Sequence, residues 1–170
     1  MDALTLVGSG LIDINSDTLD YWVSPDYSLA TALPTISADG RTFTFTLRGD
    51  INWSDGRSIT SADFQYAWDN ASKPENNFVG LDDLARIESF RTPDPRTIVV
   101  TLKEPLARFL ALGVAAIAVP VPRHIWEGKP WRDPSGNPEV RKPSVVSGPF
   151  IPQELSPERS TFVRRRPTSR

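Results

Sequence analysis

The chain has 170 residues, of which 39% are hydrophobic and 24% are charged, a composition typical of a globular domain. The net charge of −2 and the isoelectric point of about 5.4 exclude the chain-wide positive field of nucleic-acid and anionic-membrane binders, so we expect no nucleic-acid partner. Cysteine is absent, which excludes disulfides, thiolate metal sites and thiol nucleophiles.

Two segments bear on membrane association and export. The longest apolar run, residues 106–120, contains Arg108 and Gly113 and is shorter than the ~20 residues of a membrane-spanning helix, so we interpret it as core. Met1 is followed at once by Asp2 without a basic flank, and the pattern of a secretory signal is therefore missing at this point.

The first half of the chain predicts several strands. Residues 4–14 and 19–23 read as a strand, a turn and a second strand. Residues 42–47 alternate between threonine and apolar residues, which places Phe43, Phe45 and Leu47 on one face of a strand. A turn at residues 48–50 leads to Ile51 and Trp53, and this spacing predicts a hairpin.

A helix is predicted over residues 61–72. Thr60 and Asp63 form a variant of the capping box, in which both side chains satisfy free backbone amides of the first turn. An apolar stripe with helical spacing follows and ends before Pro74: Phe64, Ala67, Trp68 and Ala71.

The later elements are shorter. Residues 81–87 predict a short helix, residues 97–102 predict a β-branched strand, and Pro93–Pro95 predicts the turn between them. Helical spacing returns over residues 106–113, after Pro105 at a first-turn position, and this helix is expected to be short and buried.

Proline and glycine dominate beyond Pro120, and we expect extended surface chain there. A last strand is possible at residues 161–163, whereas residues 164–170 have the pattern of a frayed end. We therefore expect one α+β domain over residues 1–155, and a frayed or incomplete segment over residues 156–170. The fold class is α+β, with an antiparallel or mixed β-sheet and a few covering helices.

Four motifs occur in the order and spacing of one protein family. They are Leu29–Ala30 with the strand Asp39–Arg48, the turn Trp53–Phe64, the stretch Val119–Glu127, and Val146–Phe150. In these motifs the chain resembles extracellular solute-binding proteins of family 5, the oligopeptide, dipeptide and nickel type. Departures occur at Ser58, where proline is usual, at Ser61, where alanine is common, and at Val146, one place from the usual glycine.

The resemblance implies an accessory domain and the edges of the first lobe of a periplasmic-binding-protein-like two-lobe protein. Such a protein captures peptides or similar small solutes in the periplasm or at the cell surface, often as a lipoprotein, and presents them to the permease of an ABC transporter. The resemblance further implies a monomer that is not an enzyme and has no cofactor. Since family members are much longer, we expect this chain by itself to bind ligand weakly.

The resemblance also implies candidate ligand contacts. In the family, the loop after the helix that resembles residues 61–72 approaches the ligand, which corresponds here to Glu75, Asn76, Asn77 and Phe78. Asn76 and Asn77 would hydrogen-bond a peptide backbone or hydroxyl groups, and Phe78 would pack on an apolar part. The alternative is a solvated loop.

Polar residues elsewhere permit other readings. Asp13, Asn15 and Asp17 have the oxygen spacing of a calcium loop, but the glycine and the closing glutamate are replaced, so a hairpin turn is favoured. His124 is the only histidine, which excludes a multi-histidine metal centre, and we expect a hydrogen bond near a loop-to-helix junction. No metal site is expected.

Three further groups of residues have a structural and a functional reading. Five aspartates could supply a glycoside-hydrolase pair, although turn and cap roles are favoured: Asp55, Asp63, Asp69, Asp82 and Asp83. Trp53 and Trp68 are expected in the core, while Trp126 and Trp131 could form a stacking platform. Five arginines are interpreted as a solvated tail: Arg159, Arg164, Arg165, Arg166 and Arg170.

Two other function classes stay open from the sequence alone. The first is a structural or interaction domain that contacts a protein partner through the proline-rich residues 128–143. The second is a carbohydrate hydrolase domain.

Overall fold

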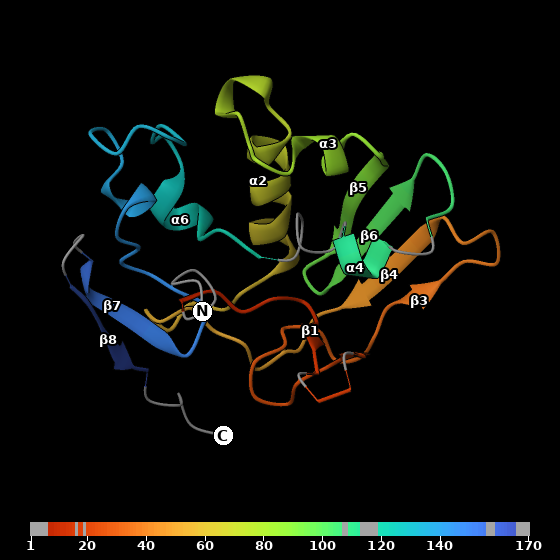
Figure 1. Ribbon diagram of the computed structural model, residues 1–170, viewed down its shortest axis with the longest axis horizontal. Helices are drawn as coiled ribbons and strands as arrows, with labels where there is room; N and C mark the ends of the chain where they lie inside the picture. The colour runs from red at the N-terminus through yellow and green to blue at the C-terminus, as the bar shows by residue number, and fades with distance from the viewer. Residues whose placement is uncertain are drawn as a thin grey trace.

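The computed structural model describes residues 7–15, 17–18, 20–106, 109–112, 119–155 and 159–165. Helix α2 lies between a four-stranded sheet on one side and the segment that carries α6 on the other (Figure 1). The elements, in chain order, are β1 (Asp13–Ile14), β2 (Tyr21–Trp22), β3 (Thr35–Ile36), β4 (Thr42–Thr46), α2 (Ser61–Ala71), the 3-10 turn η1 (Pro74–Asn76), α3 (Leu81–Leu84), β5 (Ile87–Asp94), β6 (Thr97–Leu102), α4 (Phe109–Leu112), α6 (Arg123–Trp126), η2 (Pro138–Val140), β7 (Phe150–Leu155) and β8 (Ser160–Arg164).

The main sheet has the strand order β3-β4-β6-β5 and is antiparallel throughout. Alternation in β4 buries Phe43 and Phe45, which lie opposite Val100 and Ile98 of β6. This confirms the predicted strands at residues 42–47 and 97–102. The two strands therefore form the centre of the hydrophobic core.

Helix α2 packs its apolar stripe against this sheet. Asp63 caps the helix, since its Oδ2 accepts a hydrogen bond of 3.0 Å from the backbone N–H of Thr60. Phe64 is fully buried, and the ring of Trp68 stacks on Phe90 of β5 with centroids 5.2 Å apart. The predicted helix over residues 61–72 is confirmed.

The hairpin predicted around residues 48–50 is wrong. The β4 ladder is occupied by β3 and β6, and the side chain of Arg48 fixes the turn by binding Asp50. Residues 51–59 instead form a small hairpin of their own, in which Trp53 and Arg57 are joined by a backbone hydrogen bond of 2.8 Å. Trp53 reaches the core by this route, and its predicted burial is confirmed.

Several shorter elements were only partly predicted. The helix expected at residues 81–87 ends at Leu84, because Ile87 already begins the edge strand β5, which the sequence analysis did not predict. Of the helix expected over residues 106–113, residues 109–112 are confirmed as α4, and Phe109 is buried against Phe43, whereas Leu106 is not helical. Residues 107–108 and 113–118 lie outside the described ranges.

The segment beyond Pro120 is less extended than predicted. It contains α6, η2 and strand β7, and it buries Asn137 and Glu139, because both side chains hydrogen-bond the backbone of this segment. Strand β8 pairs antiparallel with β7 and includes the predicted strand at residues 161–163. Part of the segment that was expected to be frayed is therefore ordered by main-chain pairing, whereas residues 156–158 and 166–170 lie outside the described ranges.

Candidate functional site

The loop after α2 holds the residues predicted to contact ligand, and it lies at the top of the view in Figure 1. Asn77 adopts the left-handed backbone conformation, with φ of 45°, and its side chain is exposed. The Nδ2 of Asn76 donates a hydrogen bond of 2.8 Å to the backbone oxygen of Asn70, and Phe78 packs against the core. Of the three predicted residues, only Asn77 presents a solvent-exposed side chain.

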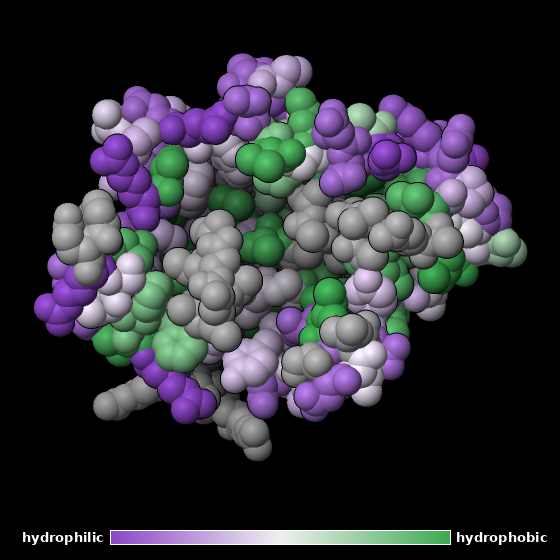
Figure 2. All heavy atoms as spheres, in the orientation of Figure 1, coloured by the Kyte–Doolittle hydropathy of each residue, from purple (hydrophilic) through white to green (hydrophobic). Residues whose placement is uncertain are grey.

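Val79 follows in the same loop and was not singled out by the sequence analysis. Its side chain is 99% exposed, whereas Phe78 beside it is half-buried. Hydrophilic residues cover the tip of this region in the space-filling view (Figure 2). The loop therefore offers Glu75, Asn77 and Val79 to solvent, a mixed polar and apolar surface.

The motif residues meet at a junction between the small hairpin of residues 51–59 and the later segments. The backbone N–H of Ser54 donates to the oxygen of Val146 at 2.9 Å, and the Val146 N–H donates to Ser54 Oγ at 3.1 Å. The Trp53–Phe64 and Val146–Phe150 motifs are thus joined by reciprocal hydrogen bonds. Gly148, in the second of these motifs, lies against the N-terminal segment, because a Cβ on it would lie 2.6 Å from the backbone carbon of Val7.

His124 adds the third motif to this junction. Its Nε2 lies 2.7 Å from Oδ2 of Asp55, which confirms the expected hydrogen bond beside the loop-to-helix boundary at Pro122. Burial would raise the pKa of the Asp55 carboxyl, but hydrogen bonds from the Arg57 backbone N–H and from the His124 ring hold that pKa below its usual value. The contact joins the small hairpin of residues 51–59 to α6.

Arg165 is tethered to the same junction. Its Nη2 donates to the backbone oxygens of Asn52 and Trp53, at 2.6 and 2.7 Å, and Nη1 reaches the oxygen of Ser147 at 3.4 Å. Burial lowers the pKa of this guanidinium, which the nearby Asp55 partly offsets. The interpretation of Arg165 as part of a solvated tail is wrong, and nothing in the basic run distinguishes it from Arg164, which is exposed.

In the first hairpin, two of the side-chain oxygens that a calcium site would need already accept hydrogen bonds within the protein. Asn15 Oδ1 accepts hydrogen bonds from the backbone N–H groups of Asp17 and Thr18, and Asp13 Oδ2 accepts one from Ser28. Strands β1 and β2 pair antiparallel around this turn, so the predicted hairpin is confirmed, but the first strand is shorter than predicted because residues 7–12 form no strand. Within the described ranges, no three metal-binding side chains form a cluster.

Aromatic residues gather between α2 and α6. Trp126 and Trp131 have ring centroids 5.1 Å apart, and Trp131 lies 6.0 Å from the ring of Tyr66. All three are half-buried and tilted against one another. They pack as a satellite cluster, which accounts for the two tryptophans that the sequence analysis left open.

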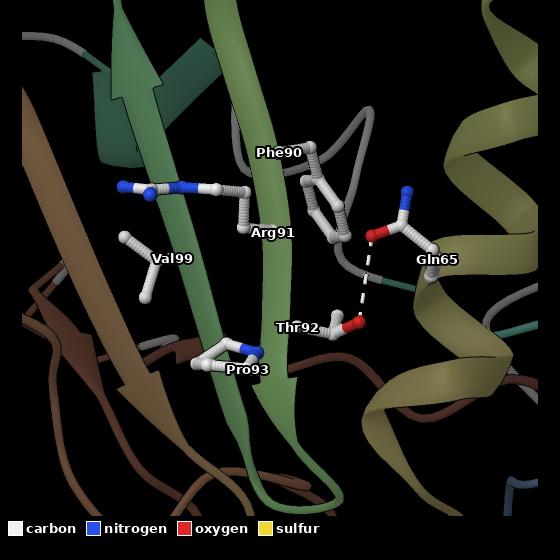
Figure 3. Close-up of a pocket in the computed structure, with 6 residues that line it drawn as sticks. All are labelled: Gln65, Phe90, Arg91, Thr92, Pro93 and Val99. Atoms are coloured by element: carbon white, nitrogen blue, oxygen red, sulfur yellow. Dashed lines mark hydrogen bonds between the residues drawn. The ribbon is translucent and has the colours of Figure 1, made fainter.

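Two hollows lie along α2 rather than at the predicted loop. One, of about 410 Å³, is lined by Gln65 of α2 and by residues of β5 and β6: Phe90, Arg91, Thr92, Pro93 and Val99 (Figure 3). The second, of about 230 Å³, is lined by Ala62, Gln65, Tyr66, Asp69, Thr92 and Arg123.

No helix within the described ranges is long and apolar enough to cross a membrane.

Comparison with known proteins gives a family match. The sequence model of the bacterial extracellular solute-binding proteins, family 5 Middle, matches residues 24–168. Protein XP55 of Streptomyces lividans is 36% identical over 124 residues, which cover 73% of this chain and 21% of that protein. The oligopeptide-binding protein OppA of Bacillus subtilis is 30% identical over 161 residues, covering 83% of this chain and 27% of that protein.

Solved structures show the same fold. NikZ from Campylobacter jejuni, solved in complex with Ni(L-His), superposes with a TM-score of 0.80 at 22% identity, over 97% of this chain and 31% of its own. OppA from Haemophilus influenzae superposes with a TM-score of 0.78 at 21% identity, over 95% and 33% of the two chains. The expected α+β class is therefore confirmed. The chain spans about a quarter of the length of the curated relatives it matches.

Proposed function

Because the chain belongs to the bacterial extracellular solute-binding proteins of family 5, we propose that it is part of a protein that captures peptides or similar small solutes for an ABC transporter. The family consists of solute-binding proteins. We propose that this chain likewise acts by binding, without catalysis or a cofactor. Its relatives support a peptide ligand, since OppA of Bacillus subtilis is named as an oligopeptide-binding protein.

The observation that carries this proposal is the convergence of the family motifs on one junction. Ser54 bonds Val146, and Asp55 bonds His124, so residues more than sixty positions apart hold the same small hairpin. These side chains are occupied by structural contacts. They support the role of a scaffold that holds other surfaces in place for ligand binding.

We propose that this chain contacts ligand through the loop after α2. Asn77 has an exposed amide and Val79 an exposed apolar side chain, and together they could contact the backbone and the side chains of a bound peptide. Asn76 and Phe78 would hold the loop in shape through their contacts with Asn70 and the core.

The remaining parts of the proposal concern the whole protein. We propose that it acts outside the cytoplasm as a monomer, with no nucleic-acid partner, and that it receives further ligand contacts from a second lobe. We also propose that residues 1–155 form one domain unit. A ligand enclosed between two lobes gains affinity from both, so this chain alone would bind weakly.

A calorimetric test of the loop uses the longer protein that contains this chain. Substituting Asn77→Ala and Val79→Ser together should weaken binding of a defined oligopeptide, because an exposed amide and an apolar contact are removed. Gln153→Ala is the matched control, since it removes another exposed amide from strand β7, which lies away from the loop after α2 in Figure 1. Equal affinity of the loop variant and the control would contradict the proposed contact.

A further inference from the structure

Strand β5 lies at the edge of the main sheet, and the larger hollow follows its free side. Among the described strands, β6 is the only neighbour of β5. Four consecutive residues of β5 line the hollow, although successive side chains of a strand point to opposite faces of a sheet. In Figure 3, Phe90 and Thr92 point toward α2. Arg91 and Pro93 point to the other side of β5. A hollow that touches both sets of side chains lies along the main-chain edge of the strand.

The register of the sheet shows which main-chain groups of β5 face this hollow. The backbone N–H of Leu102 donates to the oxygen of Arg41, so every second residue of β6 bonds the strand β4, and the residues between them bond β5. Val99 belongs to the second set and lies opposite Arg91. Phe90, the neighbouring residue, therefore directs its N–H and C=O away from β6 and toward the free edge. Within the described ranges, no backbone group outside the sheet bonds Phe90.

The free edge is short. A β-bulge lies between Arg91 and Asp94, and Pro93 within it has no N–H to donate. A second register shift lies near the start of the strand. Bulges and prolines of this kind protect an edge strand from pairing with a long, flat strand. The regular part of the edge is therefore limited to residues 89–92, which suits a short partner.

The two sides of the hollow differ in chemistry. On the side of α2, the wall is formed by the buried ring of Phe90 and by Gln65, whose Oε1 accepts a hydrogen bond from Thr92. On the other side, Arg91 is exposed beside Val99, and no ion pair among the described residues engages its guanidinium. Opposite charges on facing strand positions attract each other. An acidic residue is therefore favoured opposite Arg91, and an apolar residue is favoured opposite Phe90.

We propose that the free edge of β5 binds a short extended peptide segment of another protein by strand addition, with an acidic residue opposite Arg91 and an apolar residue opposite Phe90. Main-chain hydrogen bonds to the N–H and C=O of Phe90 supply the pairing, and the two side-chain contacts supply the selectivity. The hollow, of about 410 Å³, provides room for the added segment. This site goes beyond the proposed solute-binding function and does not depend on it, because it uses no residue of the loop after α2.

The test titrates this chain with the peptide acetyl-Thr-Glu-Val-Thr-amide and follows the backbone amides by NMR. When this peptide lies antiparallel to β5, its valine faces Phe90 and its glutamate faces Arg91. The N–H of Phe90 should shift and gain protection from hydrogen exchange, whereas the N–H of Arg91, which faces β6, should change much less. Equal changes at the two amides, or shifts confined to residues 75–79, would overturn strand addition at β5.

A methylated peptide and two arginine variants separate the main-chain and side-chain contributions. The same peptide with N-methylvaline lacks the N–H that donates to Phe90, so it should bind about fivefold more weakly. Arg91→Gln should weaken binding of the original peptide about threefold. Arg164→Gln, at an exposed position of β8, is the matched control and should leave the affinity unchanged. Equal affinities for the two peptides would contradict the main-chain pairing, and equal effects of the two variants would contradict the role of Arg91.

Two other occupants of this edge would give different results. If a second copy of the chain covers the edge, the N–H signal of Phe90 will depend on protein concentration in the absence of peptide, and sedimentation will show a dimer. If the rest of the longer protein covers the edge, the peptide will shift Phe90 in this chain but not in the longer protein labelled at phenylalanine. Either result would overturn the proposal.

Discussion

His124 Nε2 and Asp55 Oδ2 lie 2.7 Å apart although 69 positions separate the two residues in the sequence. The side chains of His124 and Asp55 are 18% and 29% exposed, and the contact lies at the surface of the molecule. The pair joins α6 to the small hairpin of residues 51–59, and it holds together two segments that carry family motifs. Its removal should loosen the contact between these segments.

The first prediction concerns this pair. His124→Ala should lower the free energy of unfolding by about 1 kcal/mol, because Asp55 then loses a hydrogen-bond partner in a partly buried place. Urea denaturation measures the change. Arg123→Ala, which removes an exposed ion pair with Glu127, serves as the neighbouring control and should cost no more than about 0.5 kcal/mol. Equal losses in the two variants would argue against a special role for the contact between His124 and Asp55.

The second prediction follows from the lowered pKa of Asp55. A carboxyl whose pKa is lower in the folded chain stabilises the fold above its unfolded pKa, and this stabilisation is lost as the pH falls through the folded value. The melting temperature of the wild type should therefore fall more steeply than that of Asp55→Asn as the pH is lowered from about 5 to about 3. Parallel curves for the two proteins would contradict the prediction.

The third prediction concerns Arg165. Replacing it by methionine should destabilise the chain by about 1–3 kcal/mol, because the backbone oxygens of Asn52 and Trp53 lose charged donors. Arg164→Met is a matched control at an exposed position of β8 and should change the stability by less than about 0.5 kcal/mol. Thermal unfolding of both variants distinguishes a tethered arginine from a solvated one.

The fourth prediction concerns the central strand pair. Phe45→Ala should cost about 3–5 kcal/mol, since its fully buried ring would leave a cavity opposite Ile98. Thr46→Ala, at the next and exposed position, should cost less than about 1 kcal/mol. Chemical denaturation of the two variants measures the difference in their free energies of unfolding. A decrease of less than about 1 kcal/mol in Phe45→Ala would show that this sheet is not the centre of the core.

Local signals account for the elements that the sequence predicted well. Alternation in residues 42–47, the β-branched run of residues 97–102 and the capping residues Thr60 and Asp63 each encode one element through neighbouring residues. Strand β5 escaped prediction because a helix-like segment precedes it and Pro93 interrupts its pattern. Strand β7 also escaped prediction, because Pro152 interrupts its pattern.

Long-range pairing could not be predicted in the same way. The choice of β6 rather than residues 51–53 as the partner of β4 depends on contacts between distant segments. The junction around Asp55 likewise depends on His124 and Arg165, which no local pattern connects. For the predicted loop, the sequence indicated the segment but not which side chains face solvent, because Phe78 and Asn76 turn inward through contacts with the core and with Asn70.

The most direct test of the proposed scaffold role compares two proteins by calorimetry with one oligopeptide library. The longer protein that contains this chain should bind members of the library at a single site, and the 170-residue chain alone should bind the same peptides at least about a hundredfold more weakly. Tight one-site binding to the 170 residues alone, or no peptide binding by the longer protein, would contradict the account.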